Sequence, residues 1–362
     1  MKDLETEDYL DSKDLALVIA WPDVTARGDE KWMAVLKRLG IVKNLNFKVG
    51  HAAIVLLHRE SGTMAYYDFG RYITPRGYGR ARSAESDPRL RLFTKATITG
   101  NNEIGNIHAI LEELHQLEFA THGGGRMFFS LSEGISYAKA TTLANRLVSQ
   151  GLIKYGAIAK GHNSCSRFVA QTLSAGMKDK HPAKATLIYP ESIKPSPMSN
   201  VVNAVTNGTI YCYYENSLTK MKMNRWQSLR LQIDLLLHNF SSGKAKQLPC
   251  DRTPGCISEP SRPSHLPKSA QWLGGIGEGA WFFLEQVTKA GSYAVIKYTS
   301  RGDEEYRVNC EAGQPIEPHV PYQFTYHLHY QRYILQQGQT QITLNAMPIA
   351  AERLVTEQQE NN

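Results

Sequence analysis

The sequence lacks the segments that mark a secreted or membrane-spanning chain. Its opening residues, MKDLETEDYLDSKDL, are polar and acidic and contain no apolar stretch suited to a signal peptide. The longest apolar runs, such as residues 53–57, fall far short of the roughly 20 apolar residues that a membrane-spanning helix needs. We therefore expect a cytoplasmic protein without a membrane span.

Cysteine is scarce as well. The chain of 362 residues has 5 cysteines, which are Cys165, Cys212, Cys250, Cys256 and Cys310. An odd number without a secretion signal argues against a disulfide framework. Cys250 and Cys256 have no second Cys or His pair at the spacing of a zinc finger. We expect no disulfides, no structural metal and no cofactor.

Charge of one sign is not concentrated in long runs. The net charge is +7, but the basic residues are mostly dispersed and no recognised nucleic-acid-binding module is present, so we expect no nucleic-acid partner. The one dense patch, RYITPRGYGRARS, contributes Arg71, Arg76, Arg80 and Arg82. Because arginine pairs bidentately with carboxylate or phosphate, the patch predicts a lip for an anionic substrate group, with a solvated loop as the alternative.

The composition that remains is that of a globular protein. The chain is 42% hydrophobic and 21% charged, so it can bury a sizeable core. Apolar periodicity predicts strands at residues 15–20, 51–59, 63–72, 126–131 and 209–214. It predicts helices at residues 30–39, 106–118, 136–149, 166–175 and 228–240.

The character of the chain changes beyond about residue 180, where prolines become frequent. Residues 241–270 are rich in Ser, Pro and Lys with little periodicity, as is typical of a linker. Residues 271–350 read as successive short strands. We therefore expect an α+β protein with a first domain at residues 1–215, a helix and linker at 216–270, and a small antiparallel β domain at 271–355.

One cysteine lies where a thiol would be reactive. The stretch GHNSCSRFVAQTLSAG places Cys165 at the point where a loop becomes a helix, with Asn163 or Ser164 as the N-cap. The helix dipole lowers the pKa of a thiol there, and free backbone N–H groups stabilise an oxyanion. The alternative is a small buried side chain without reactivity.

A nucleophilic cysteine needs a base. His51 opens a predicted strand, and strand alternation places it on the same face as Ala53 and Val55. The next strand returns through the short connection ESG and brings Asp68 near the level of His51, where a carboxylate orients an imidazole. Tyr66 and Tyr67 compete for the position of Asp68, because hairpin register is not fixed by the sequence. His162 competes with His51 as the base.

This order of residues resembles a known superfamily. A histidine that opens a strand, a polar residue on the next strand and a later cysteine that begins a helix are similar to the circularly permuted NlpC-type papain-like hydrolases, which include the lecithin retinol acyltransferase-like proteins. The resemblance covers roughly residues 15–215. The segments AWPDVTARGDEKW, VGHAAIVLL and NSCSRFVAQ resemble more closely a bacterial family of that fold that has no assigned activity.

The resemblance implies a permuted papain-like core, in which an antiparallel sheet packs on helices. It implies Cys165 as nucleophile, His51 as base and Asp68 as the orienting group. The predicted function is a cysteine hydrolase, a peptidase or amidase, that cleaves an amide or ester. The alternatives are an acyltransferase, or a non-catalytic binding protein that uses the same cleft.

The predicted substrate is a small molecule or peptide with an anionic group. We expect its contacts to come from Arg71, Tyr67, Trp21 and Asn163. The stretch THGGGR could form a backbone nest for an anion, but a turn is the simpler interpretation. The stretch GGIGEGAWF is not preceded by a clear strand or followed by a helix pattern, so we do not interpret it as a phosphate-binding loop. The sequence does not indicate an oligomeric state.

Overall fold

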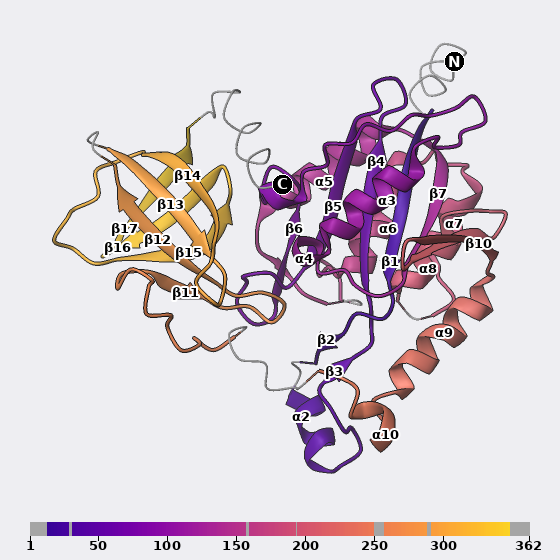
Figure 1. Cartoon of the computed structure of the whole chain (residues 1–362), viewed down its shortest axis with the longest axis horizontal. Coiled ribbons are helices and arrows are strands. Elements are labelled where there is room, and N and C mark those ends of the chain that lie inside the picture. The colour runs from indigo at the N-terminus through magenta and orange to yellow at the C-terminus, as the bar shows by residue number, and fades with distance from the viewer. Residues whose placement is uncertain are drawn as a thin grey trace.

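The computed structural model describes residues 13–28, 31–156, 159–192, 194–249, 257–287 and 291–347. These residues form two bodies that lie side by side, a larger main domain and a smaller C-terminal domain (Figure 1). Both contain an antiparallel sheet, and helices pack on the sheet of the main domain. The predicted α+β class is therefore confirmed. Cys250 and Cys256 lie outside the described residues.

The main domain is built on an eight-stranded sheet in the order β10-β9-β7-β1-β4-β5-β6-β8. Its strands are β1 (Asp14–Trp21), β4 (His51–Leu57), β5 (Met64–Gly70), β6 (Tyr78–Arg82), β7 (Met127–Ile135), β8 (Ile153–Lys154), β9 (Thr209–Tyr214) and β10 (Ser217–Lys222). The central strands β1 and β4 are buried along their whole length. Their unbroken apolar sequences follow from this burial on both faces.

Helices cover both faces of this sheet. One face packs against α5 (Tyr137–Gln150), α6 (Cys165–Gly176), α7 (Pro182–Ile188) and α8 (Pro197–Asn203). The other packs against α3 (Ile107–Gln116), α4 (Glu118–Thr121) and the short turn η1 (Pro88–Leu90). Alternate residues of β1 belong to the two cores, as Val18 packs with the first group and Leu17 with the second. The predicted helices at 106–118, 136–149 and 166–175 are thus found as α3, α5 and α6.

Smaller elements extend the main domain. A two-stranded ribbon pairs β2 (Ala26–Arg27) with β3 (Asn46–Phe47), and α2 (Lys31–Arg38) lies between them in sequence. Helix α9 (Arg225–Leu237) begins earlier than predicted, because Asn224 and Gln227 form a capping box. The short helix α10 (Ser242–Ala245) follows it.

Strand β10 was not anticipated, because its sequence SLTKMK is mostly exposed and has no apolar run. It pairs with β9 through a tight turn at Glu215 and Asn216, whose φ angles are 49° and 58°. Two consecutive positive φ angles are typical of a two-residue hairpin turn. The domain boundary that we predicted after residue 215 therefore falls inside a hairpin of the main sheet.

The C-terminal domain is a seven-stranded antiparallel sheet in the order β11-β12-β13-β14-β17-β16-β15. The strands are β11 (Gln271–Leu273), β12 (Ala280–Gln286), β13 (Ser292–Tyr298), β14 (Glu304–Ala312), β15 (Tyr322–His329), β16 (Arg332–Gln337) and β17 (Thr340–Ala346). The sheet curls into a nearly closed barrel, in which the Gln271 side chain bonds the backbone of Tyr322 and Phe324 across the two edge strands. The predicted antiparallel β domain is confirmed.

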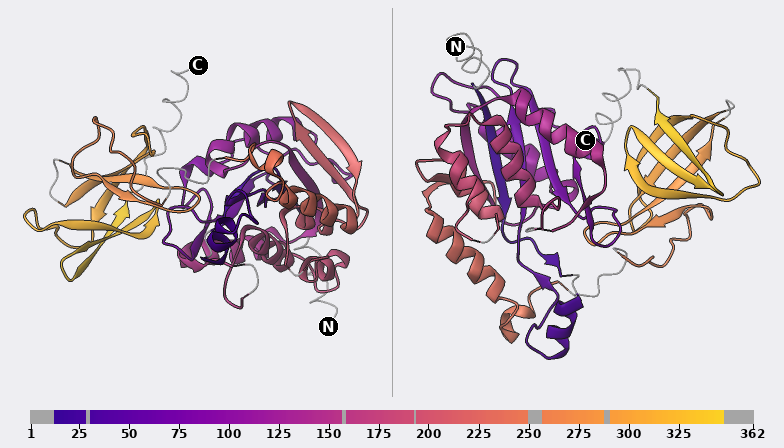
Figure 2. Two further views of the ribbon diagram at one scale, coloured as in Figure 1. Left: turned by 90° about the horizontal axis from the view of Figure 1, so that it is seen from below. Right: turned by 180° about the vertical axis from the view of Figure 1, so that it is seen from behind.

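The loop between β11 and β12 joins the two domains. The Ile73 N–H donates to the Glu278 carbonyl at 2.9 Å, and the Gly277 N–H donates to the Arg71 carbonyl at 3.0 Å. The Arg80 guanidinium adds a bond of 2.7 Å to the Tyr326 carbonyl on β15. The views in Figure 2 agree that this loop reaches from the barrel to the main domain.

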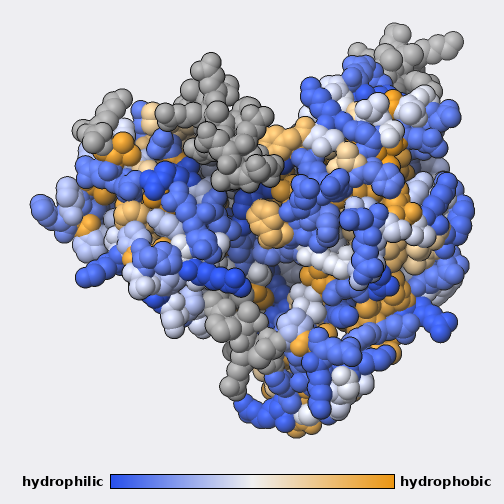
Figure 3. Space-filling model, in the orientation of Figure 1, coloured by the Kyte–Doolittle hydropathy of each residue, from blue (hydrophilic) through white to orange (hydrophobic). Residues whose placement is uncertain are grey.

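The surface differs between the two domains. On the face shown in Figure 3, hydrophilic residues cover most of the C-terminal domain, whereas apolar residues reach the surface mainly over the main domain. In the part of the chain that the structure describes, no helix combines the length and the apolar character that crossing a membrane requires.

Candidate active site

Cys165 is the first residue of α6, as the sequence predicts. Ser164, with extended backbone, is the N-cap, and its hydroxyl accepts a hydrogen bond from the Arg167 N–H at 3.3 Å. The N–H groups of the first helical turn have no acceptor within the helix, and the helix dipole is positive there. The thiol therefore lies at the positive end of the helix dipole. The Ser166 hydroxyl lies 3.7 Å from its sulfur.

His51 opens β4 at the same end of the sheet. It pairs with Trp21 in the β1–β4 register, and the two rings stack with centroids 5.9 Å apart and an angle of 13° between their planes. Gly50 precedes it with φ +73°, and a Cβ there would lie 3.0 Å from the Trp21 carbonyl oxygen. Glycine is required at this position both by the backbone conformation and by the close approach of the two strands.

The Cys165 thiol and the His51 imidazole lie close enough for each to shift the pKa of the other. Burial lowers the pKa of His51, but its hydrogen bonds to Asp68 and Cys165 outweigh this and raise the pKa to about 9. Burial raises the pKa of Cys165, but the bond to His51 and its charge bring the pKa below its ordinary value. Smaller contributions come from the Ser166 hydroxyl and the Ala52 N–H. Each group therefore favours the charged form of the other, thiolate on Cys165 and imidazolium on His51.

Asp68 on β5 is fully buried and faces this pair. It is opposite Ala53, not His51, in the β4–β5 register, and its Oδ2 lies 3.5 Å from the His51 Nε2. Its strongest partner is Arg82, whose Nη2 and Nε donate to the two carboxylate oxygens at 2.6 and 3.0 Å. Burial raises the pKa of Asp68, but Arg82 and His51 hold the pKa far below its usual range. Asp68 is therefore an anion near the imidazole, although Arg82 binds it more closely than His51 does.

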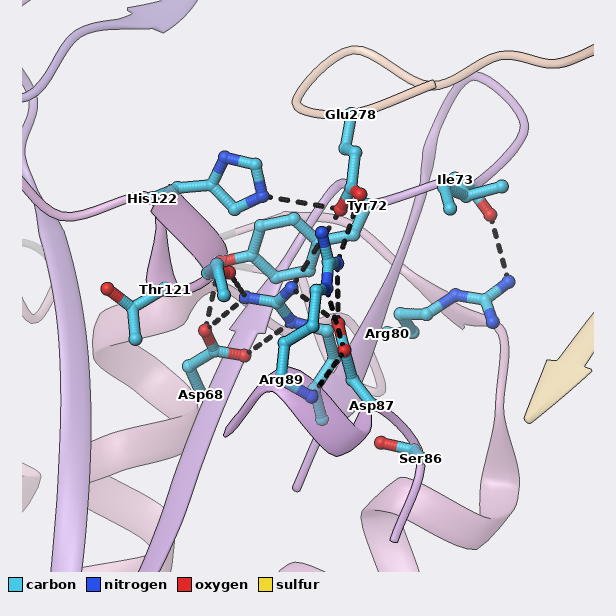
Figure 4. A network of polar contacts seen from close by, with 12 residues as sticks. Asp68, Tyr72, Ile73, Arg80, Ser86, Asp87, Arg89, Thr121, His122 and Glu278 are labelled. Carbon is cyan, nitrogen blue, oxygen red and sulfur yellow. Dashed lines mark hydrogen bonds and ion pairs between the residues drawn. The ribbon is translucent and has the colours of Figure 1, made fainter. Parts of the chain in front are cut away.

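Tyr72 joins these two groups, and sequence reasoning missed it. Its hydroxyl lies 3.1 Å from the His51 Nε2 and donates to the Asp68 Oδ2 at 3.2 Å. Because Tyr72 and Asp68 both lie at Nε2, Nδ1 is the nitrogen left to face the thiol. A Cβ on Gly70 would lie 2.3 Å from the Tyr72 ring, so the ring occupies space that only glycine leaves open. Figure 4 shows Tyr72 within the surrounding polar network.

The Cys165–His51 pair lies in the wall of a cavity of about 1060 Å³. Its other walls come from the β2–β3 ribbon, α9, residues 194–197 and the loop at Ile276 and Gly277 of the C-terminal domain. Among the described lining residues other than His51 and His122, the basic side chains are Arg27, Arg71, Arg76 and Lys194, and the acidic one is Glu118. The cavity therefore carries an excess of positive charge, which suits an anionic ligand.

The arginine-rich patch divides into two parts. Arg71 and Arg76 line the cavity, as a substrate-binding lip requires. Arg80 and Arg82 are buried and bind protein groups, so the expectation that they hold a substrate is wrong. They belong to β6, where strand alternation and the contact with the C-terminal domain remove them from solvent.

Three of the predicted substrate contacts lie outside the cavity wall. Trp21 is fully buried, and its Nε1 donates to the Glu118 carboxylate at 3.0 Å. The Tyr67 hydroxyl donates to Asn145 on α5 at 2.8 Å, on the face of β5 opposite to Asp68. Asn163 is also buried, and its side chain binds the Ser164 N–H and the Gln171 side chain. All three side chains therefore contact other parts of the protein and not the cavity, and we withdraw them as substrate contacts.

Two other candidates from the sequence are His162 and the stretch THGGGR. His162 packs over Gly156, outside the residues that line the cavity. THGGGR forms a turn after α4, in which Gly123 packs on Trp21 and Arg126 makes a bidentate ion pair with Asp23 at 2.8 and 2.8 Å. Within the described ranges, no group of three or more His, Cys, Asp or Glu side chains is arranged to hold a metal ion.

Comparison with known proteins connects each domain to a different family. Residues 16–182 match the family described as type VI secretion system effector TseH-like, which is less than half of the chain. The crystal structure of the type VI secretion system effector TseH is 19% identical, covers 58% of this chain and 99% of its own, and has a TM-score of 0.40. No curated protein matches the chain. Residues 270–347 match the DUF6695 C-terminal domain, so the main domain is similar to TseH-like effectors and the C-terminal domain to a separate family.

Proposed function

We propose that this protein is a cysteine hydrolase that cleaves an amide or ester, with a peptidase or amidase as the specific form. The observation that carries the proposal is that Cys165, the first residue of α6, and His51, the first residue of β4, line the same large cavity. The pKa of the thiol is lowered and that of the imidazole is raised, as nucleophilic catalysis by a thiolate requires.

The reaction follows from this geometry. The Cys165 thiolate attacks the carbonyl carbon of the substrate, and the N–H groups of Cys165 and Ser166 at the start of α6 stabilise the oxyanion. The His51 imidazolium gives its proton to the leaving amine or alcohol as the carbon–heteroatom bond breaks, which leaves a thioester on Cys165. His51 then takes a proton from water, and the hydroxide attacks the thioester to release the acid and regenerate the thiol. Tyr72 and Asp68 hold the imidazole by Nε2.

The order of these residues supports a circularly permuted papain-like domain of the NlpC type. His51 and Asp68 lie on adjacent antiparallel strands, and the cysteine helix α6 comes after both in the chain. The match of residues 16–182 to TseH-like effectors is a further reason to consider a bacterial hydrolase. The cytoplasm remains the proposed location of the chain, on the sequence alone.

The charge of the cavity supports an anionic group on the substrate. Arg71 stacks on the Tyr155 ring, with its guanidinium carbon 4.8 Å from the ring centroid, and donates to the Arg27 carbonyl at 2.7 Å. These contacts hold one guanidinium in place beside the cavity that Cys165 lines. A carboxylate or phosphate on the substrate would meet a cation that is already oriented.

The test is selective labelling of Cys165. The protein is treated with iodoacetamide at pH 6, and the labelled cysteines are identified by mass spectrometry over time. We expect Cys165 to react much faster than the other four cysteines and than free cysteine. The variant C165S then shows whether the ester p-nitrophenyl acetate is hydrolysed through this thiol, since an acetylated Cys165 should be found in the wild-type protein alone.

The alternatives give different results in the same assay. Labelling of Cys165 no faster than free cysteine would refute the hydrolase and leave a binding protein. Acetyl transfer to an added amine or alcohol in preference to water would identify an acyltransferase, because the same thioester serves both reactions.

A further inference from the structure

The ring of Tyr72 is held between two flat groups. The Arg82 guanidinium carbon lies 3.5 Å from the ring centroid. The His122 imidazole stacks on the same ring, with centroids 4.8 Å apart and an angle of 19° between the planes. Two groups this close cannot share one face of the ring, so they lie on opposite faces. The arrangement leaves the Tyr72 hydroxyl directed at the His51 Nε2.

Both flat groups are tied to one carboxylate of the C-terminal domain. The Glu278 Oε2 lies 3.3 Å from the His122 Nε2 (Figure 4). The same oxygen lies 3.8 Å from the Arg82 Nη1. The other oxygen of Glu278 binds Lys297 at 2.7 Å and Arg89 at 3.1 Å. These two cations keep the carboxylate charged and fixed in place.

The backbone of Glu278 is fixed to the same place. The Ile73 N–H donates to the Glu278 carbonyl, and Tyr72 and Glu278 form a parallel β-bridge. The Glu278 side chain is only 12% exposed. Its main chain and its side chain therefore both contact the segment that carries Tyr72.

We propose that Glu278 is a positioning residue of the active centre, which holds Arg82 and His122 against Tyr72 and so keeps the Tyr72 hydroxyl on His51. This inference rests on the proposed function for its catalytic consequence. It assigns to the C-terminal β domain a part in the catalytic centre, through the glycine-rich loop between β11 and β12.

Glu278 could act as a clamp, which holds Arg82 and His122 against Tyr72, or only as a counter-charge. The two roles predict opposite changes in the alkylation rate of Cys165 when Glu278 is replaced. The titratable groups around Glu278 include Arg80, Arg82, Arg89, Lys297, His122, Asp87 and Glu305. Loss of its negative charge alone would leave the centre more positive, which favours the Cys165 thiolate and speeds its alkylation. Loss of the clamp instead releases Tyr72 and with it His51, which slows alkylation. The direction of the change thus separates the two roles.

The experiment compares E278Q with E278D, and both with the control E285Q. Glu285 lies on β12 of the same domain and pairs with Arg307 at the surface. Rates of Cys165 alkylation by iodoacetamide are measured at pH 6, and crystal structures of the variants are determined. We expect E278Q to react roughly tenfold more slowly, within the cost of up to about 100-fold that a misplacement of about 1 Å can have. E285Q should match the wild type.

The variant E278D shortens the side chain and so withdraws the carboxylate from His122, but it keeps a negative charge near Lys297 and Arg89. We expect slower alkylation here too, and in both crystal structures the Tyr72 hydroxyl should leave the His51 Nε2. A folded E278D or E278Q with Tyr72 unmoved and with an unchanged or faster rate would overturn the clamp.

The two proposals fail separately. If the Cys165 of the wild-type protein is not unusually reactive but Tyr72 moves in the crystal structures of the variants, the hydrolase fails and the clamp stands. If Cys165 is reactive and neither rate nor structure changes in E278Q, the clamp fails and the hydrolase stands.

Discussion

Cys165 in the main domain and Cys310 in the C-terminal domain carry thiols whose pKa values shift in opposite directions. Cys310 lies on β14 in the apolar core of the C-terminal domain, and burial raises its pKa to about 12. Burial also raises the pKa of Cys165, yet there the bond to His51 reverses the direction of the shift. The difference indicates that a charged partner, and not burial alone, sets the direction in which the pKa of a thiol shifts.

The largest effect should come from removing that partner. In H51A, burial is left to act on Cys165 without an opposing imidazolium, so its pKa should rise toward the behaviour of Cys310. Because each pKa unit changes the thiolate fraction tenfold, we expect alkylation at pH 6 to fall by roughly 100-fold. The control is H162A, since His162 lies near in sequence but outside the cavity wall. A rate in H51A equal to that of the wild type would exclude His51 as the partner.

Asp68 should have the next largest effect. D68N removes the anion that raises the pKa of His51 and leaves the buried Arg82 with less counter-charge. We expect alkylation to slow roughly tenfold and stability to fall by about 3 kcal/mol, because breaking a buried ion pair leaves an uncompensated charge. D87N is the matched control, since Asp87 also binds Arg82 but does not contact His51. Equal losses of reactivity in D68N and D87N would mean that Asp68 acts only through stability.

The pH dependence separates the two members of the pair. Cys165 must be deprotonated in both alkylation and hydrolysis, and its lowered pKa means that this requirement is met at lower pH than for an ordinary thiol. His51 must be protonated for hydrolysis alone, because it supplies the proton to the leaving group. With a pKa of about 9, its charged form is present below pH 9 and is lost above it. Hydrolysis of an amide should therefore fall above about pH 9, while alkylation stays high; a parallel fall of both rates would contradict the assignment of the acid.

A smaller effect should follow from Tyr72. Y72F removes the hydroxyl that bonds His51 and Asp68, and we expect alkylation to slow by about threefold, in keeping with the net value of one hydrogen bond. G70A provides a second approach, since its Cβ would press on the Tyr72 ring and displace it without removing a polar group. Wild-type rates in both variants would show that Asp68 alone suffices to orient His51.

The smallest effect concerns the positive charge of the cavity. Iodoacetate is anionic and iodoacetamide is neutral, so the ratio of their rates at Cys165 measures local charge. We expect the double variant R71A/R76A to lower this ratio by about twofold to threefold, because nearby charges are partly screened. R38A is the control, since Arg38 on α2 is exposed and does not line the cavity. An unchanged ratio would remove the reason to expect an anionic substrate.

The sequence predicted those parts of the site that have a local signature. Cys165 and His51 each stand at the beginning of an element, and loop composition and periodicity mark such positions. Asp68 followed from the hairpin, although the β4–β5 register places Ala53, not His51, opposite it. The fold class followed from the same periodicity, whereas β10 escaped because an exposed edge strand has no apolar pattern.

The rest depends on tertiary packing that no short stretch encodes. Tyr72 stands at the end of the predicted strand 63–72, and it reaches His51 only because Gly70 leaves space for its ring. The arginines beside it look alike in sequence, but the approach of the C-terminal domain buries Arg80 and leaves Arg71 at the cavity. Glu278 lies in GGIGEG, a stretch whose glycines raise the question of a phosphate-binding loop and give no sign that its acidic residue contacts the active centre.

The bridge between Tyr72 and Glu278 also has a consequence for biosynthesis. The chain is made from its N-terminus, so His51, Asp68 and Cys165 all leave the ribosome before Glu278 does. With the clamp as proposed, the main domain can fold first, but its thiol reaches full reactivity only when the β11–β17 domain has docked. The active centre would then become fully reactive only after residues 271–346 have been synthesised and folded, so the unfinished chain would have little hydrolase activity. A chain truncated before residue 270 should stay weakly reactive for the same reason.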